Sequence, residues 1–204
     1  MPLRISWRLV ALSGIAAAVA SCSSHPVATP ASTPPPSATL PHSGAPKVSH
    51  PLPASVLSGD PCQDALTSDQ LKLIFGMVPS GKRDDIGSLG PGCNWNNVDT
   101  GAMTAVGYTT QQAGGLSAVY AGTKPQATIW RELPPIQGLP AVAHSTFPNR
   151  RNDFCQVSVG ISDEHSFDAS LALSFAKVGK VDACDVAARV ADMVVTNLRH
   201  KAGA

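Results

Sequence analysis

Five cysteines constrain this chain more than any other feature of its sequence. Four of them, Cys62, Cys93, Cys155 and Cys184, are spread over its last two thirds, whereas Cys22 directly follows an apolar segment. Four Cys allow three disulfide pairings. Sequence order favours Cys62–Cys93 and Cys155–Cys184, each closing a loop of about 30 residues that stabilises the fold by about 3–4 kcal/mol in the chain-entropy model.

Zinc binding and redox activity are the weaker roles for these four cysteines. A structural zinc site needs pairs of ligands at close spacing, and no two of these Cys stand that close. A redox-active pair needs a Cys-x-x-Cys motif, which the sequence lacks. An even set of Cys is instead typical of disulfides in an exported protein.

The N-terminus has the parts of an export signal. Arg4 and Arg8 form a short positive segment, and Leu9 to Ala20 form an apolar segment of 12 residues. As a helix this segment would span about 18 Å, well short of the ~30 Å hydrocarbon core of a bilayer. A membrane-spanning anchor is therefore the weaker interpretation, and we predict a signal peptide over residues 1–21.

The tetrapeptide Val19-Ala20-Ser21-Cys22 resembles the bacterial lipobox, in which the Cys receives diacylglycerol. The resemblance implies cleavage just before Cys22 and lipid attachment to it, and the alternative is an ordinary signal peptide followed by a coincidental Cys. Two or more acyl chains give stable attachment to a bilayer. We therefore expect a lipoprotein anchored at the extracytoplasmic face of the cell membrane.

A linker is expected between this anchor and a folded domain. Ser23 to Ser58 contains nine Pro, many Ser, Thr and Ala, a single charged residue (Lys47) and no aromatic residue. Such a segment buries too little apolar surface to offset the entropy of ordering. We predict that residues 22–58 are the lipidated Cys and a disordered stalk, and that residues 59–204 form one domain.

The sequence contains capping signals for a helix near the start of the domain and for one at its end. Thr67-Ser68-Asp69-Gln70 matches a capping box, and Gly76 is a natural end for that helix. Asp182 is the expected N-cap of a C-terminal helix with apolar residues at helical spacing. A further short helix is expected over Gly115 to Gly122.

Between these helices, the sequence predicts strands. Alternation along Cys155 to Ile161 is typical of a strand with one face on a core. Six strands are expected: Cys93 to Val98, Ala102 to Thr110, Ala127 to Leu133, Ala141 to Phe147, Phe154 to Ile161 and Phe167 to Ser174. The fold class is therefore α+β, a single domain with an antiparallel sheet of five to six strands, flanked by an N-terminal and a C-terminal helix and held by two disulfides.

Net charge excludes some partners. Residues 59–204 hold 12 basic and 14 acidic side chains, so their net charge is 12 − 14 = −2. This balance lacks the basic footprint of a nucleic-acid-binding domain, and no polybasic patch for an anionic membrane surface is visible in the sequence.

Three groups of residues are candidates for a functional site. Asp163, Glu164, His165 and Asp168 have ligand chemistry, but their flanks favour a solvated turn. The side chains that we single out as possible partner contacts are Trp130, if it faces outward, and the pair Arg150 and Arg151, whose guanidinium groups match carboxylate or phosphate.

No motif in the sequence supports a catalytic site or a cofactor site. The chain has no nucleophile elbow, zincin helix or phosphate-binding loop, and His144 is more typical of a structural His in a strand than of a ligand. We predict no catalytic residue, no metal and no cofactor. The first hypothesis is a non-catalytic binding or interaction domain in the cell envelope. The alternatives are a carrier or sensor of a small or apolar ligand and, less favoured, an uncharacterised hydrolase.

Four short motifs together resemble a family of actinobacterial lipoproteins, of the mycobacterial type, defined by a domain of unknown function, DUF3558. They are Asp60-Pro61-Cys62, Gly92-Cys93-Asn94-Trp95, Cys155-Gln156-Val157 and Asp182-Ala183-Cys184-Asp185. The resemblance covers about residues 60 to 200 and supports the two favoured cysteine pairings. The expected sheet flanked by helices also looks similar to Mog1/PsbP-like folds, which is a looser analogy. The family resemblance brings no enzymatic activity and no catalytic residues, and a fold match would not supply function.

Overall fold

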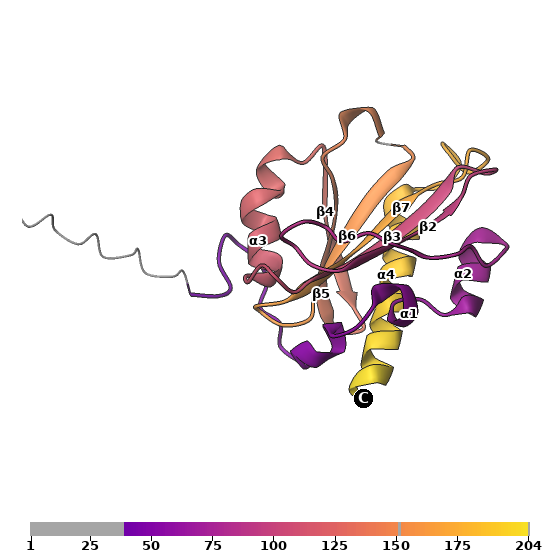
Figure 1. The fold of residues 1–204 in the computed structure, drawn as a ribbon. Helices are drawn as coiled ribbons and strands as arrows, with labels where there is room; N and C mark the ends of the chain where they lie inside the picture. The colour runs from indigo at the N-terminus through magenta and orange to yellow at the C-terminus, as the bar shows by residue number, and fades with distance from the viewer. Residues whose placement is uncertain (1–38, 151, 204) are drawn as a thin grey trace, which may run out of the picture. The chain divides into compact units, whose positions relative to one another are not determined.

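One antiparallel sheet organises the part of the chain that the computed structural model describes, residues 39–150 and 152–203. The strand order is β1-β2-β3-β7-β6-β5-β4 (Figure 1). The strands are β1 (Lys82–Arg83), β2 (Gly92–Asn97), β3 (Ala102–Thr109), β4 (Ile129–Ile136), β5 (Leu139–Ser145), β6 (Phe154–Gly160) and β7 (Ser166–Ala172). All six predicted strands are present, and the α+β class is confirmed.

The sheet has seven strands, one more than the highest number predicted, and β1 is the strand that was missed. This strand has two residues, both exposed, and pairs with β2 at the edge of the sheet. Two charged residues show no alternation of apolar and polar side chains, which is the signal on which a sequence-based strand assignment depends. Tertiary pairing alone creates this strand.

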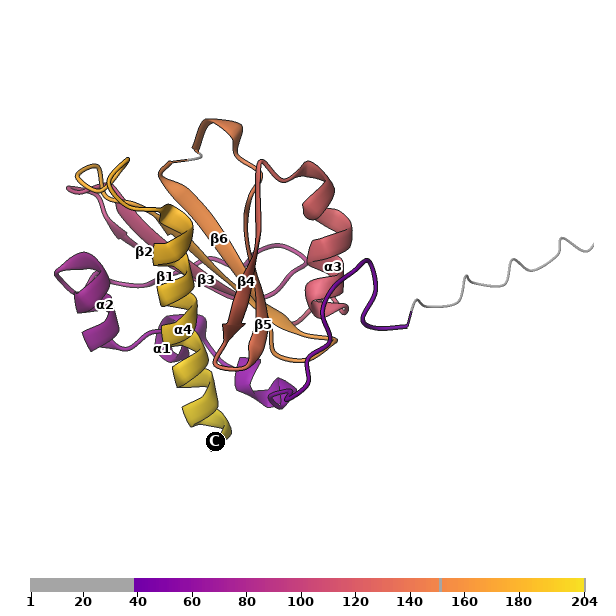
Figure 2. The same cartoon turned by 180° about the vertical axis from the view of Figure 1, so that it is seen from behind.

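Helices cover the two faces of the sheet (Figures 1 and 2). The strand β5 shows the division, because Ala141 and Ala143 belong to the main core with α4, whereas Val142 between them packs with α3. Successive side chains of a strand point to opposite faces, so α4 and α3 lie on opposite sides. The helices are α1 (Pro61–Asp64), α2 (Ser68–Phe75), α3 (Gly115–Gly122) and α4 (Ala183–Ala202), with 3-10 turns η1 (Ala54–Leu57), η2 (Lys124–Gln126) and η3 (Pro148–Arg150).

The predicted helix caps are confirmed. Thr67 and Gln70 form the complete capping box of α2, and Gly76 ends this helix in the left-handed conformation at φ 77°. The side chain of Asp182 accepts a hydrogen bond from the backbone N–H of Asp185 at 2.9 Å, so it caps α4. These local signals satisfy backbone groups that each helix end otherwise leaves unpaired.

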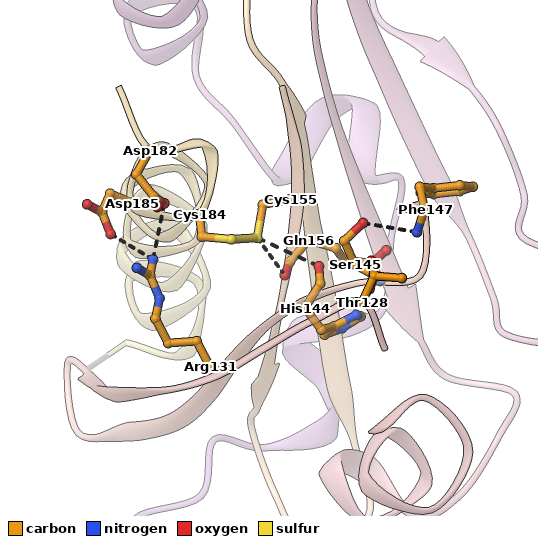
Figure 3. Close-up of a disulfide and its surroundings, with 10 residues drawn as sticks. All are labelled: Thr128, Arg131, His144, Ser145, Phe147, Cys155, Gln156, Asp182, Cys184 and Asp185. Carbon is orange, nitrogen blue, oxygen red and sulfur yellow. Dashed lines mark hydrogen bonds and ion pairs between the residues drawn. A yellow bond between two sulfur atoms is a disulfide. The ribbon is translucent and has the colours of Figure 1, made fainter. Parts of the chain in front are cut away.

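Both favoured disulfides are present. Cys62–Cys93 joins α1 to β2, and Cys155–Cys184 joins β6 to the first turn of α4. Figure 3 shows the second bond bridging the sheet and the helix, with Arg131 of β4 reaching the carboxylates at the start of α4. The disulfides therefore attach the first and the last helical regions to the sheet.

The predicted stalk does not extend to Ser58. Residues 39–58, here called the strap, are described by the structure and pack on the domain. Leu52, Val56 and Leu57 are buried in the main core, and the backbone N–H of Leu52 donates to the carbonyl of Ile161 at 2.8 Å. The prediction was wrong here because composition was averaged over the whole Pro-rich segment, which hid a short apolar sequence at its end. The predictions for residues 1–38 lie outside the described residues.

The strap reaches both faces of the sheet. The backbone N–H of His42 donates to the Ser117 hydroxyl of α3 at 2.9 Å, and that of Val48 donates to the Asp163 carboxylate at 2.8 Å. Ser37 to Ala204 forms one compact unit that contains the sheet, the core and both disulfides. A unit with its own sheet, core and disulfides has the properties expected of a domain that folds by itself. Among the described residues, no helix is long and apolar enough to cross a membrane.

Candidate functional site

An apolar cleft of about 560 Å³ opens between α2 and α4. Its walls are the end of α2 (residues 73–76), the first half of α4, the end of β7 with the loop that follows it, and the start of β3. Val186, Val190 and Met193 supply the α4 wall at helical spacing, so one stripe of that helix faces the cleft. Apolar clefts of this size are typical of small-molecule sites.

Uneven attachment of α2 creates the cleft. Gln70, in the first turn of α2, exchanges two side-chain hydrogen bonds with Asn197 of α4, at 2.8 and 3.3 Å. Asn197 also donates to the carbonyl of Ala65 at 2.9 Å. No hydrogen bond of this kind joins the last turn of α2 to α4 within residues 39–150 and 152–203. The two helices are therefore held together at one end, and the space lies at the other.

The charged residues that line the cleft are all basic. Lys177, from the loop after β7, and Arg189, on α4, are both exposed, and no Asp or Glu lines the cleft. Neither cation forms an ion pair with another described residue, whereas Arg131, Arg150 and Lys201 each do. An apolar cleft with cations at its edge is suited to a ligand with an apolar body and an anionic group.

A second candidate is a polar network on the opposite face of the sheet. Nε2 of His144 (β5) lies 2.8 Å from the hydroxyl oxygen of Ser158 (β6), and that hydroxyl donates a short hydrogen bond to the carboxylate of Asp168 (β7). Burial lowers the pKa of His144 below its ordinary value, and the Asp168 carboxylate opposes this effect. His144 is therefore neutral near neutral pH.

This network contains Ser, His and Asp but lacks the geometry of a nucleophilic triad. In such a triad His stands between the other two and removes the Ser proton. Here Ser158 stands in the middle and directs its proton at Asp168, so its oxygen accepts from His144 instead. Ser158 is also fully buried. The arrangement satisfies buried polar groups, which agrees with the structural role predicted for His144.

The acidic cluster near the β6–β7 turn does not form a site. Asp163 accepts a hydrogen bond from the strap, the ring of His165 bonds to Ser162 within the turn, and Asp168 lies in the network described above. The backbone carbonyl of Glu164 accepts from the start of α3. The described residues contain no group of three or more His, Cys, Asp or Glu that could hold a metal ion.

Trp130 does not form an exposed contact surface. Its ring packs edge-on against Tyr120 with centroids 4.9 Å apart, and Nζ of Lys124 lies 5.1 Å from its centroid. The indole N–H is buried, and Tyr120 is buried as well. Trp130 itself is half-buried against α3, and its role as a partner contact stays a prediction.

Arg150 is engaged within its own loop. Its guanidinium donates to the Asp153 carboxylate at 2.9 and 3.0 Å and lies 4.9 Å from the ring of Phe154. The carboxylate occupies one edge of the guanidinium, and contact of Arg150 with a partner stays a prediction. Arg151, and likewise Cys22, lie outside the described residues.

Comparison with known proteins identifies the family. The sequence matches the family described as Protein of unknown function (DUF3558) over residues 17–197, and the chain therefore belongs to it. No curated protein and no solved structure matches the chain. The likeness to Mog1/PsbP-like folds stays a prediction.

Sequence reasoning missed the residues of the cleft. The spacing of Leu71, Ile74 and Phe75 places them on one face of α2, yet only Leu71 is buried, and Leu73 is 75% exposed. An apolar residue outside that face was the signal available in the sequence. The cleft itself depends on the angle between two helices, which the sequence pattern does not contain.

Proposed function

We propose that this DUF3558 protein is an exported lipoprotein whose domain binds a single-chain amphiphile, with the apolar chain in the α2–α4 cleft and an anionic group at Lys177 and Arg189. The proposal is a binding function without catalysis. It unites the two hypotheses that the sequence favours, a binding domain in the cell envelope and a carrier or sensor of an apolar ligand.

The cleft is the observation that carries the proposal. Its volume of about 560 Å³ falls in the range of about 300–1,000 Å³ that is usual for small-molecule sites. Its walls consist mainly of aliphatic, Phe and Met side chains, and the flexible Met103 and Met193 adapt to ligands of different shape. A long apolar chain gains most from such a surface, since burial of apolar area is non-directional.

The charge of the cleft favours an anionic head group. Lys177 and Arg189 stand at its edge in a domain whose acidic residues outnumber its basic ones. A hydrogen-bonded carboxylate or phosphate interacts with such side chains more strongly than a neutral group does. Neutral lipids and cationic ligands are correspondingly disfavoured.

Binding of 11-(dansylamino)undecanoic acid to the unit Ser37–Ala204 tests this proposal directly, because the dansyl group fluoresces more strongly in an apolar site. We expect saturable binding that palmitate competes away. Val186→Trp, which fills the cleft from α4, should abolish it. Arg189→Gln should weaken it by roughly tenfold, in line with one charged hydrogen bond of about 1.5–3 kcal/mol.

Two controls separate the parts of the proposal. Lys72→Gln changes an exposed cation of α2 that does not line the cleft, so it should leave the affinity unchanged. The methyl ester of the probe should bind the wild type more weakly than the acid. Equal affinity for acid and ester would show that the protein does not recognise an anionic head group. An affinity that Val186→Trp leaves unchanged would show that the probe does not bind in the cleft.

The lipid anchor is the second part of the proposal. The lipobox resemblance of residues 19–22, the preceding apolar segment and the even set of four remaining Cys support it. Exchange of Cys22 for Ser in a bacterial host should move the protein from the detergent phase to the aqueous phase in a detergent partition assay. A variant that keeps its signal peptide would also enter the detergent phase, so retention of the cleaved variant is the result that would exclude lipid on Cys22. An actinobacterial envelope, and a cell membrane with the domain on its extracytoplasmic side, belong to this same proposal.

A further inference from the structure

Large exposed apolar side chains gather at one end of the domain. In the antiparallel sheet the β2–β3 turn, the β5–β6 loop and the loop after β7 all lie at the same end. Figures 1 and 2 show these three loops at the end of the domain that lies away from the strap, residues 39–58. Their exposed apolar residues, with those around the end of α2, are called the apolar end: Leu73, Met77, Val78, Val98, Phe147, Phe175, Val178 and Val181.

This clustering is strongly one-sided. Of the large apolar side chains that are exposed among the described residues, only Ile86 lies elsewhere, near the opposite end of the sheet. Val98 is 84% exposed and Phe175 is 73% exposed, each in a different loop. Scattered exposed apolar residues need no explanation, but a contiguous group of them marks an interaction surface.

Contacts join the loop after β7 to both of the other loops. The backbone N–H of Phe175 donates to the carbonyl of Thr100 at 2.9 Å, and its ring lies against Gly101 of the β2–β3 turn. Val178 borders a hollow formed by the β5–β6 loop at Pro148 and Asn149. The loops therefore present their apolar residues together.

Cations lie among the apolar residues of the loop after β7. The loop after β7 carries Lys177 and Lys180 between its apolar residues and no acidic residue, and Arg189 lies next to it in the cleft wall. Of the nearby acids, Asp153 is paired with Arg150, and Asp182 and Asp185 share Arg131, which leaves Asp99 in the β2–β3 turn. Lysine stems lie along apolar surface while their ammonium groups reach outward.

We propose that the apolar end docks on an anionic lipid bilayer, with Val98, Phe175 and Val178 inserted among the acyl chains and Lys177 and Lys180 at the head groups. Separate apolar loop tips with lysines between them match the interface of a bilayer, where apolar side chains enter and cations meet anionic lipids. The cleft shares Lys177 and Val181 with this surface, so its ligand would enter from the membrane. Docking itself does not require an occupied cleft or an anchor on Cys22.

Flotation of the unit Ser37–Ala204 with lipid vesicles tests the docking surface. We expect binding to vesicles of phosphatidylcholine with phosphatidylglycerol, weaker binding to phosphatidylcholine alone, and release at high salt. The double variant Val98→Ser, Phe175→Ser should bind at least about tenfold more weakly, because two large apolar side chains no longer enter the bilayer. Ile86→Ser removes a comparable side chain at the other end and should bind as the wild type does.

Folding and ligand binding are controlled separately. Neither Val98 nor Phe175 lines the cleft, so the double variant should still bind the dansyl fatty acid as the wild type does. Val98→Ser alone changes a side chain with almost no packing and should still weaken flotation. Lys180→Glu should weaken binding to anionic vesicles only.

A position-specific reporter gives the decisive readout. Tryptophan introduced by Phe175→Trp should be quenched by lipids brominated on their acyl chains, whereas tryptophan introduced by Ile86→Trp should not. Absence of wild-type flotation with anionic vesicles, or equal flotation of the double variant, would overturn the proposal. A dimer that the double variant disrupts would assign this surface to a second copy of the chain and overturn it as well.

Discussion

The helices α2 and α4 lie side by side and share the same local design, yet the protein holds them very differently. Each has a side-chain N-cap and ends at a Gly in the left-handed conformation. Along α4, eight residues are buried, whereas α2 buries only Leu71. The caps determine that a helix forms, and burial determines how firmly it is held. The cleft lies along the helix that burial holds least.

The disulfides test a related contrast, between α1, which directly precedes α2, and α4, and this test has the largest expected effect. Replacement of Cys155 and Cys184 by Ala should lower the free energy of unfolding by about 3–4 kcal/mol from chain entropy, with a further loss because both cysteines are buried in the core. The Cys62–Cys93 bond closes a loop of similar length, but Cys62 is only partly buried, so replacement of this pair by Ala should lower the free energy of unfolding by less. Urea denaturation of both variants measures the difference. An equal or larger loss from the second pair would contradict the contrast.

Truncation within the two cleft walls is the next test. Val190→Ala on α4 removes two buried carbons and should cost about 2 kcal/mol of unfolding free energy. Leu73→Ala on α2 removes an exposed side chain and should change this free energy by less than about 0.5 kcal/mol. Both residues line the cleft, so both variants should weaken binding of the dansyl fatty acid. A large stability loss from Leu73→Ala would show that α2 is held more firmly than its burial indicates.

The same contrast explains what the sequence could predict. The caps at Thr67 and Asp182 and the order of the cysteines are local or pairwise patterns, and the structure confirms the elements and bonds that they predicted. The strap was missed because a few apolar residues in a Pro-rich segment become meaningful only when the β6–β7 turn and the core lie beside them. The cleft and the apolar end depend on which loops the topology brings together, and no single segment encodes that.

Removal of one cap from each helix gives the smallest effect and the most local one. Thr67→Ala deletes the hydroxyl that accepts from the Gln70 N–H, and Asp182→Ala deletes the cap of α4, each at a cost of about 1 kcal/mol. Since burial holds α2 so weakly, its amides should open locally, and Thr67→Ala should speed their hydrogen exchange by about fivefold. The amides of α4 should exchange only through global unfolding, so Asp182→Ala should speed exchange throughout the core by a similar factor. Exchange measured residue by residue distinguishes these patterns. If Thr67→Ala affected core amides as much as those of α2, the two helices would unfold as one unit, and the cleft would have a rigid wall on both sides.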